Sequence, residues 1–210
     1  MGTPGLAPFL ERLGWAWTDD QVASLRCYGE WLADEGMRIG GIGPSESDRL
    51  WDRHLLDSLL FGAGMAADAS VLDVGSGVGL PGIPLSIGFP GAAVTLLERS
   101  GRRADALRRV ATIVGLDVEV AEGDLTRVST RFDRVAFRAS LPLEEAIRSL
   151  PSLLTDAGEG WFGLGRGRST AVDEWRRHPA RLPDGWTAQL WESPNGVLDS
   201  TAWLLRIGRW

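Results

Sequence analysis

The sequence Val71-Leu-Asp-Val-Gly75-Ser-Gly77-Val-Gly79-Leu-Pro-Gly82-Ile-Pro84 joins a short apolar run directly to a cluster of glycines and prolines. Glycine adopts positive φ angles and has no Cβ, so a backbone built from it turns tightly and approaches a ligand closely. Pro81 and Pro84 fit the first turn of a following helix, where a missing N–H donor is tolerated. The segment therefore predicts a buried strand, a ligand-binding loop and a helix in succession.

From residue 70 onward, the chain alternates short apolar runs with helical stretches, which is typical of a parallel sheet covered on both faces. Five such runs are Val71–Val74, Ala93–Leu97, Val118–Ala121, Phe132–Phe137 and Gly160–Leu164. Two later runs, Trp186–Trp191 and Thr201–Ile207, are joined by a link too short for a crossover helix, so we expect them to pair antiparallel. The pattern predicts an α/β fold with a seven-stranded, mostly parallel sheet and an antiparallel C-terminal hairpin.

Residues 1–66 are expected to form a helical extension that packs on a core domain of residues 67–210. Thr18-Asp-Asp-Gln21 is a capping-box pattern and predicts the start of a first helix. Four glycines, at positions 36, 40, 41 and 43 before Pro44, predict the end of that helix and a flexible connection. After Pro44, Ser45-Glu-Ser-Asp48 can cap a second helix with an apolar stripe on one face.

Two cofactor classes fit the glycine pattern. Read from Gly77, the string satisfies the dinucleotide fingerprint G-x-G-x-x-G. A dinucleotide site needs its first glycine directly after the strand, and in that register the third glycine is replaced by Leu80. Alternating glycines after an acidic residue suit S-adenosylmethionine instead, because it has no pyrophosphate and has an ammonium group to neutralise. The expected cofactor contacts in this segment are Asp73, Gly75, Ser76, Gly77, Gly79 and Leu80.

Acidic residues follow the next two expected strands. Glu98 ends the second strand, 21 residues beyond Gly77, where a carboxylate can accept hydrogen bonds from ribose hydroxyls in either cofactor class. Gly123-Asp124 follows the third strand and can reach an adenine edge, since open α/β sheets bind ligands at the carboxyl ends of their strands. Taken singly, each is equally well read as a solvated carboxylate or a plain turn. Because these acidic residues follow successive strands, together they favour a cofactor site. Arg99, next to Glu98, is a further expected cofactor contact.

The segments Asp73-Val-Gly-Ser-Gly-Val-Gly-Leu-Pro-Gly-Ile-Pro-Leu-Ser-Ile87, Leu96-Leu-Glu-Arg-Ser-Gly-Arg-Arg103 and Arg53-His-Leu-Leu-Asp-Ser-Leu59 together resemble the glucose-inhibited division protein B family. That family methylates N7 of a guanine in 16S ribosomal RNA. The resemblance implies a Rossmann-like class I S-adenosylmethionine-dependent methyltransferase with strand order 3-2-1-4-5-7-6. It also implies cofactor contacts at Gly75, Leu80, Gly123-Asp124 and Arg138.

The chain departs from the family pattern between the first helix and the Arg53-His54 motif. Gly36 and Gly40 stand where the family has asparagines, and Ile42 stands where it has a threonine. The family's Leu-Lys-Gly after the fifth strand reads Leu164-Gly-Arg-Gly167, so Arg166 replaces the lysine one residue away. These departures favour intact cofactor binding and altered RNA recognition.

The candidate substrate-binding residues are Arg53, His54, Asp57, Arg138 and Arg166. Arg138 is suited to holding guanine O6 or a phosphate, because guanidinium offers directed donors. An ion pair with a nearby carboxylate explains Arg138 equally well. Arg53 and Asp57 share a helical face and can form an ion pair. The group of Arg53, His54 and Asp57 is therefore suited to orienting its helix as well as to contacting substrate. No catalytic base is assigned, because N7 of guanine carries a lone pair and no proton.

Composition limits the alternatives. The chain has 22 Lys+Arg against 28 Asp+Glu, a net charge of −6. We therefore do not expect its whole surface to bind nucleic acid through positive charge. Cys27 is the only cysteine and there are two histidines, which disfavours a disulfide framework or a metal site. We expect a cytoplasmic monomer without a membrane segment, acting on 16S ribosomal RNA or the small subunit. The alternatives are methylation of another RNA or small molecule, a non-catalytic cofactor-binding paralogue and, more remotely, a nicotinamide dehydrogenase.

Overall fold

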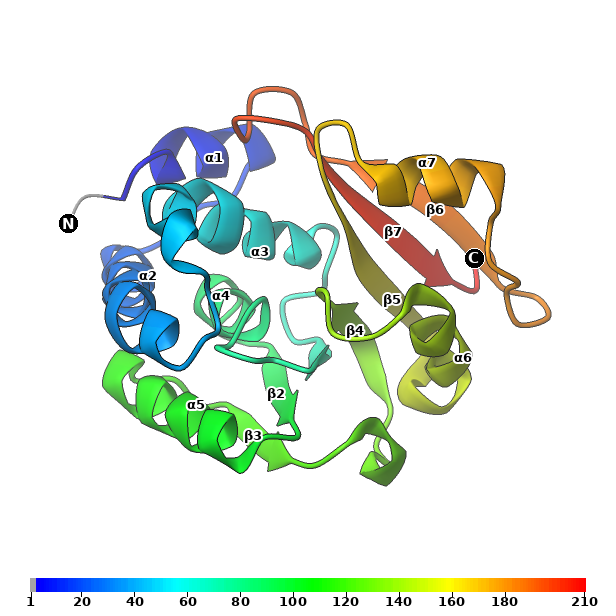
Figure 1. The fold of residues 1–210 in the computed structure, drawn as a ribbon, viewed down its shortest axis with the longest axis horizontal. Coiled ribbons are helices and arrows are strands. Elements are labelled where there is room, and N and C mark those ends of the chain that lie inside the picture. The colour runs from blue at the N-terminus through cyan, green and yellow to red at the C-terminus, as the bar shows by residue number, and fades with distance from the viewer. Residues whose placement is uncertain (1–2) are drawn as a thin grey trace.

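A computed structural model describes residues 3–210 as one seven-stranded sheet flanked by helices (Figure 1). The strands are β1 (Ser70–Val74), β2 (Ala93–Glu98), β3 (Glu119–Glu122), β4 (Phe132–Phe137), β5 (Leu154–Arg166), β6 (Thr187–Glu192) and β7 (Ala202–Gly208). The α-helices are α1 (Leu6–Leu13), α2 (Asp19–Trp31), α3 (Asp57–Leu59), α4 (Gly82–Gly88), α5 (Gly101–Val114), α6 (Leu143–Leu153) and α7 (Thr170–Arg177). The π-helical segments are η1 (Leu32–Gly36) and η3 (Leu50–Leu56), and the 3-10 segments are η2 (Pro44–Arg49), η4 (Leu60–Gly62) and η5 (Leu125–Arg127).

The strand order is β3-β2-β1-β4-β5-β7-β6, which confirms the predicted topology. β1 pairs in parallel with β2 and β4, so Asp73 lies between Leu96 and Ala136 in the sheet. β7 pairs antiparallel with β5 and β6, as expected for the terminal hairpin. The carboxyl ends of β1 to β5 therefore meet at one edge of the sheet, where open α/β folds bind ligands.

The sheet separates two buried apolar clusters. One joins α1, α2, α4 and α5 to the first face, and the other packs α6 and α7 on the second face (Figure 1). Alternation along β1 follows this division, because Val71 belongs to the first cluster and Leu72 and Val74 to the second. Both faces are covered, which explains the continuous apolar runs seen in the sequence.

The N-terminal helices differ from expectation in their details. The capping box of Thr18 and Gln21 is present at the start of α2. The helix does not end at Gly36: it continues through the π-helical segment η1 and ends at Arg38. The second helix begins at Pro44 without a side-chain cap and is a succession of 3-10 and π turns. The helix α1 was not predicted, because its N-cap is Gly5 and no polar side chain marks its start.

The extension is fastened to the sheet by a buried arginine. Arg134 of β4 donates from Nη1 to the carbonyl oxygen of Phe61 at 2.7 Å, and its guanidinium lies 4.4 Å from the ring of Trp161. Residues 3–66 thus share one apolar core with β1, α4 and α5. The division at residue 66 stays a prediction. Among the described residues, no helix combines the length and apolar character needed to span a membrane.

Candidate functional site

The glycine-rich loop follows β1 and turns back on itself through three positive-φ residues. Gly75, Gly77 and Gly79 have φ angles of 69°, 61° and 101°. A Cβ on Gly75 would lie 2.7 Å from Cβ of Ser140, so an added side chain would strike the segment after β4. Any L-residue at these positions is strained, and at Gly75 it also clashes. The sequence pattern therefore corresponds to a tight loop in which Gly75 has no room for a side chain beside Ser140 and Gly79 has none beside Ile83, whereas the space at Gly77 is open.

Two buried polar atoms beside this loop have no hydrogen-bond partner in the described part of the chain. One is Oδ1 of Asp73, whose other oxygen accepts from the Gly82 N–H at 3.0 Å. The second is Oγ of Ser140, which lies against Gly75. Burial raises the pKa of Asp73 to about 7, although the hydrogen bond from Gly82 opposes the shift. Unsatisfied buried polar atoms are costly, so their presence together marks a place for a polar ligand.

Glu98 ties the loop to the end of β2. Its Oε2 accepts from the Gly77 N–H at 2.9 Å, and its Oε1 accepts from the Ser100 N–H at 2.8 Å. The residue is only 3% exposed. These two hydrogen bonds give Glu98 a structural role in holding the loop. Each of its oxygens keeps a second lone pair that can accept from a ribose hydroxyl, and that contact stays a prediction.

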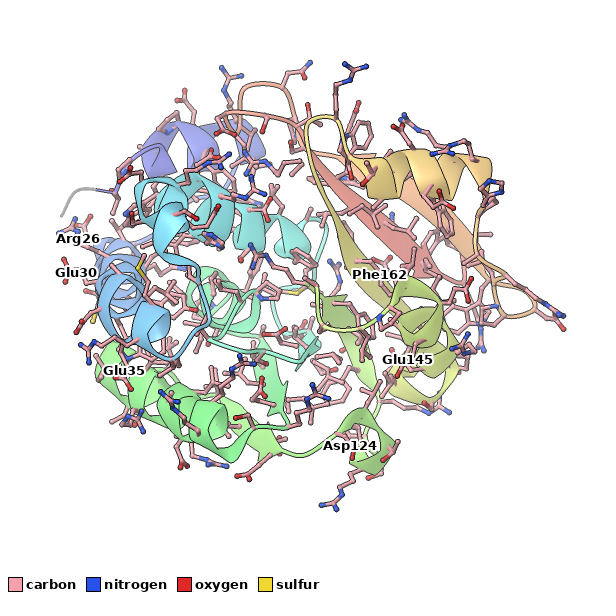
Figure 2. The ribbon with its side chains drawn as sticks, in the orientation of Figure 1. Arg26, Glu30, Glu35, Asp124, Glu145 and Phe162 are labelled. Carbon is pink, nitrogen blue, oxygen red and sulfur yellow. The ribbon has the colours of Figure 1, made fainter. Side chains whose placement is uncertain are left out.

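The acidic turn after β3 is held by local hydrogen bonds. Asp124 is the N-cap of η5, and its Oδ1 accepts from the Thr126 N–H at 2.9 Å (Figure 2). Hydrogen bonds from the Thr126 hydroxyl and N–H lower the pKa of Asp124. Gly123, with φ 154°, donates its N–H to the carbonyl oxygen of Glu98. Both residues sit at the expected edge beside exposed Arg99, and their contact with a cofactor stays a prediction.

Two residues of the N-terminal extension hold the loop, and sequence reasoning missed both. The hydroxyl of Tyr28 in α2 donates to the Val78 carbonyl oxygen at 2.8 Å, in a fully buried position. A Cβ on Gly41 would overlap Cγ1 of Val78, so the connection lies directly on that side chain. Nothing in the local sequence links residues 28 and 41 to residue 78, because both contacts are tertiary.

Four of the predicted substrate residues meet at the end of β4. Arg138 donates from Nη2 to the Arg53 carbonyl oxygen at 3.1 Å and lies 3.3 Å from His54 Nδ1. Its Nε is 3.6 Å from Oδ2 of Asp57. Ala139, the next residue, has φ 56°, a strained conformation that favours glycine and often occurs at functional sites. Arg53, His54 and Asp57 therefore face Arg138. The sequence could not predict this contact, because it joins segments that are more than 80 residues apart.

Arg166, the fifth predicted substrate residue, is bound within the protein. Its side chain is 7% exposed, and its Nη2 contacts Oδ2 of Asp52 at 2.6 Å and a carboxylate oxygen of Asp199. Its Nη1 is 3.6 Å from Oδ1 of Asp57, the carboxylate that also faces Arg138. Burial raises the pKa of Asp57, while the two arginines oppose the shift. This geometry favours a fastening role for Arg166, and its contact with substrate stays a prediction.

Comparison with known proteins places the site in a family. Residues 21–182 match the family described as rRNA small subunit methyltransferase G. The chain belongs to this family. The ribosomal RNA small subunit methyltransferase G of Mycolicibacterium smegmatis is 37% identical over 163 residues, covering 75% of this chain and 69% of that protein. The corresponding enzyme of Mycobacterium marinum is 39% identical over 156 residues, covering 72% and 67%. The family resemblance predicted from the motifs is confirmed.

Solved structures support the fold of this small subunit methyltransferase G family member. A ribosomal protein L11 methylase from Lactobacillus delbrueckii subsp. bulgaricus matches with a TM-score of 0.56 and 20% identity, covering 73% of this chain and 77% of that chain. A putative methyltransferase from Escherichia coli matches with a TM-score of 0.53 and 21% identity, covering 72% and 84%. Together with the strand order, these similarities confirm the Rossmann-like methyltransferase fold.

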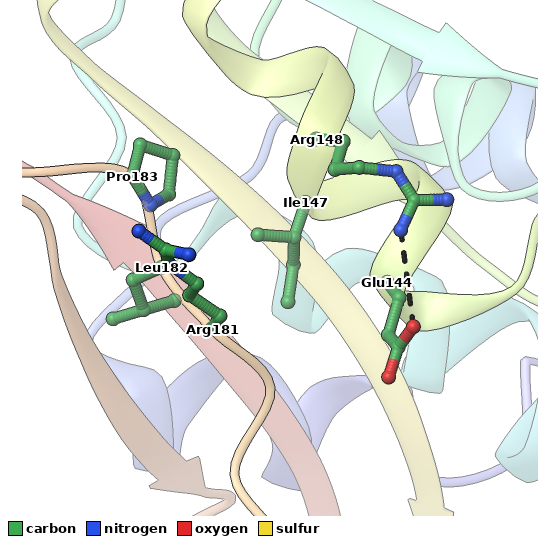
Figure 3. A pocket seen from close by; sticks show the side chains of 6 residues that line it. All are labelled: Glu144, Ile147, Arg148, Arg181, Leu182 and Pro183. Carbon is green, nitrogen blue, oxygen red and sulfur yellow. Dashed lines mark ion pairs between the residues drawn. The ribbon is translucent and has the colours of Figure 1, made fainter.

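The residues at the site fit the S-adenosylmethionine implied by this family. An unpartnered carboxylate oxygen of Asp73 suits an ammonium group, Glu98 has acceptor capacity for hydroxyls, and Gly77, whose missing side chain leaves open space, allows close approach. The described residues contain no group of three or more His, Cys, Asp or Glu side chains placed to hold a metal ion. A separate cavity of about 400 Å³, between α6 and Arg181–Pro183, includes none of these residues (Figure 3).

Proposed function

We propose that the chain transfers a methyl group from S-adenosylmethionine to N7 of a guanine in the 16S RNA of the small ribosomal subunit. Family membership supports the reaction class and the type of acceptor. A cytoplasmic location, where ribosomal RNA is assembled into subunits, follows from this proposal.

The observation that carries the proposal is the convergence of two unpartnered buried oxygens on a loop of positive-φ glycines. Ser140 Oγ lies against Gly75, Asp73 Oδ1 belongs to the end of β1 two residues before Gly75, and Glu98 fixes the loop from the neighbouring strand. Bound S-adenosylmethionine supplies an electrophilic methyl group. The loop and these side chains have the donors, acceptors and open backbone needed to bind such a molecule.

The chain's own contribution to the reaction is positioning. N7 of guanine has a lone pair and no proton, so the protein need not supply a base. N7 of guanine lies on the same base edge as O6, an acceptor that a guanidinium recognises well. Arg138 is held through Nε and Nη2, and among residues 3–210 its Nη1 has no partner. We infer that Nη1 donates to guanine O6 and orients the base, since alignment lowers the barrier to methyl transfer.

The test incubates purified protein with radiolabelled S-adenosylmethionine and small subunits, or 16S RNA, that lack N7-methylguanine, followed by nucleoside analysis. Arg138→Ala is compared with Arg148→Ala, because Arg148 is a 70% exposed arginine on α6 beside the separate cavity (Figure 3). We expect labelled N7-methylguanosine with the wild type and with Arg148→Ala, and a loss of roughly 10- to 100-fold with Arg138→Ala, the size typical of a hydrogen bond from a charged group.

Calorimetry with S-adenosylmethionine separates the two parts of the proposal. Cofactor binding without any modified nucleoside would reject the ribosomal acceptor and leave a methyltransferase for another substrate or a non-catalytic paralogue. Absence of cofactor binding, with tight binding of NADH, would reject the cofactor class. If Arg138→Ala abolished cofactor binding itself, Arg138 would belong to the cofactor site, as the family resemblance implies.

A further inference from the structure

The guanidinium of Arg138 is held by acceptors from the N-terminal extension. Nη2 lies 3.1 Å from the Arg53 carbonyl oxygen and 3.3 Å from His54 Nδ1, and Nε lies 3.6 Å from Asp57 Oδ2. All three acceptors belong to the consecutive segments η3 and α3. The side chain of Arg138 is 21% exposed, so part of it remains accessible to a ligand.

The contact between Arg138 and His54 fixes the tautomer of the imidazole. A guanidinium only donates hydrogen bonds, so Nδ1 of His54 must present its lone pair. A neutral imidazole carries one proton, which then resides on Nε2. Burial, reinforced by the positive charge of Arg138, lowers the pKa of His54 to about 4, so the ring is neutral at neutral pH.

The surroundings of Nε2 agree with a proton at that atom. Nε2 lies 3.4 Å from Oε2 of Glu46, and Arg53 Nε lies 3.3 Å from the same oxygen. Both atoms are buried, and neither makes a hydrogen bond to any described residue, so their 3.4 Å approach is a charge contact. An Nε2–H thus faces a carboxylate, whereas an Nε2 lone pair would face a negative charge.

This arrangement excludes His54 as a base for the substrate. Its side chain is 13% exposed and its Nδ1 lies 3.3 Å from Nη2 of Arg138, so the Nδ1 lone pair is engaged by a guanidinium and a neutral ring carries its proton on Nε2. The remaining role is to act through Arg138. With Nη2 engaged, rotation of the guanidinium is restricted, and Nη1 is left for a ligand.

We propose that His54, as the Nε2–H tautomer, is a positioning residue that holds Arg138 through Nδ1 and so presents Arg138 Nη1 to the ligand. The inference rests on the proposed function for the identity of that ligand, and the contact between the two side chains is tested independently of it.

The first experiment measures the tautomer in the wild-type protein. The chain has two histidines, so ¹⁵N-histidine labelling gives two rings, and His178→Asn assigns them. We expect His54 to show a protonated Nε2 and an unprotonated Nδ1. Arg138→Lys, which removes the planar fork, should shift the Nδ1 resonance. A protonated Nδ1 in the wild type would overturn the proposal, whether or not the protein methylates ribosomal RNA.

The second experiment uses a matched pair of variants. Asparagine places an amide oxygen near the position of Nδ1, and glutamine places its amide near Nε2. We expect His54→Asn to keep most of the wild-type kcat/KM and His54→Gln to lose roughly 10- to 100-fold, the range for a hydrogen bond to a charged group. Equal losses in both variants, at melting temperatures matching the wild type, would overturn the proposal.

A double mutant distinguishes positioning from general damage. In the Arg138→Lys background, His54→Gln should add little further loss, because both changes act on the same contact. A full additive loss would show that His54 acts elsewhere and would overturn the proposal. If the wild type transfers no methyl group to 16S RNA, the proposed function fails, while the nitrogen spectrum still decides the contact between His54 and Arg138.

Discussion

Gly41→Ala is the sharpest test of the contact between the N-terminal extension and the glycine-rich loop. The new Cβ would overlap Cγ1 of Val78 and lie 2.9 Å from its Cβ and Cγ2, while Val78 is 3% exposed and cannot move into solvent. Overpacking of this kind costs about 1–3 kcal/mol. Gly41 is not in the positive-φ region, so alanine also stabilises the protein by about 0.4–1 kcal/mol through the unfolded chain. The net expected loss is about 1–2 kcal/mol.

Gly43→Ala provides the matched control, because it makes the same change two residues away. Its Cβ would lie 3.9 Å from Oγ of Ser45, an ordinary contact. We expect this variant to be neutral or slightly stabilised. Urea unfolding measures both variants, and a net loss of about 1–2 kcal/mol corresponds to a melting temperature lower by roughly 2–8 °C in a chain of this size. Calorimetry should show weaker S-adenosylmethionine binding for Gly41→Ala, since Val78 belongs to the loop.

A double mutant decides whether the loss arises at Val78. In the Val78→Ala background the overlapping Cγ1 is absent, and only the Cβ contact at 2.9 Å remains. Gly41→Ala should therefore cost less there than in the wild type, a coupling of the size seen between residues in contact. An unchanged penalty in that background, or equal stability of the Gly41 and Gly43 variants, would refute the reasoning.

Three further changes test other contacts. Tyr28→Phe leaves the buried Val78 carbonyl without its donor and should lower the free energy of unfolding by about 1–3 kcal/mol, with weaker cofactor binding by calorimetry; equal values would contradict the contact. Because the native state raises the pKa of Asp73 from 3.8 to about 7, the stability from this group is full below the unfolded value and is lost as pH rises through 7. Asp73→Asn should flatten the unfolding free energy between these pH values, and identical pH profiles would reject the shift. Arg134→Met leaves the carbonyl oxygens of Phe61 and Ala63 without their donor, while Glu159 keeps Arg206 and Trp161, and urea unfolding should show a loss of about 1–3 kcal/mol for each carbonyl, against no change for a surface arginine.

The sheet could be predicted because its signals are local. Continuous apolar runs mark strands buried on both faces, and the glycines at 75, 77 and 79 mark the loop before any partner is known. The strand order came from the family resemblance, and the structure confirms it. The start of α2 was readable because its capping box lies within four residues.

The irregular helices could not be read in the same way. The sequence predicts a helix end at Gly36, yet Gly36 is the last residue of the π-helical segment η1 and lies against the side chains of Trp31 and Leu32. Glycine lowers helix propensity by about 1 kcal/mol, a preference that tertiary packing can override. The π turn of η3 has no sequence signal at all, although it places the Arg53 carbonyl oxygen opposite Arg138.

The candidate site was partly predictable for a related reason. Residues that follow parallel strands meet at one edge by topology, so Glu98, Asp124 and Arg138 could be grouped from the sequence. The hydrogen bonds that these side chains make could not be predicted from the sequence. Asp124 turns to its own helix cap, and Arg166 is enclosed by carboxylates that lie more than 30 residues away along the chain.

The extension packs directly on the glycine-rich loop and on Arg138, both of which belong to the proposed cofactor and substrate site. Tyr28 and Gly41 contact Val78 in the loop, and His54 contacts Arg138 at the end of β4. Ile42, which replaces a polar residue of the family pattern, is 4% exposed and belongs to the apolar core. A substitution in this connection therefore changes the packing that supports the loop. Because Tyr28, Gly41 and His54 contact the loop and Arg138, a change in the extension that alters RNA binding is expected to alter cofactor binding as well. The affinity for RNA and the affinity for S-adenosylmethionine must therefore both be measured in every variant of the extension.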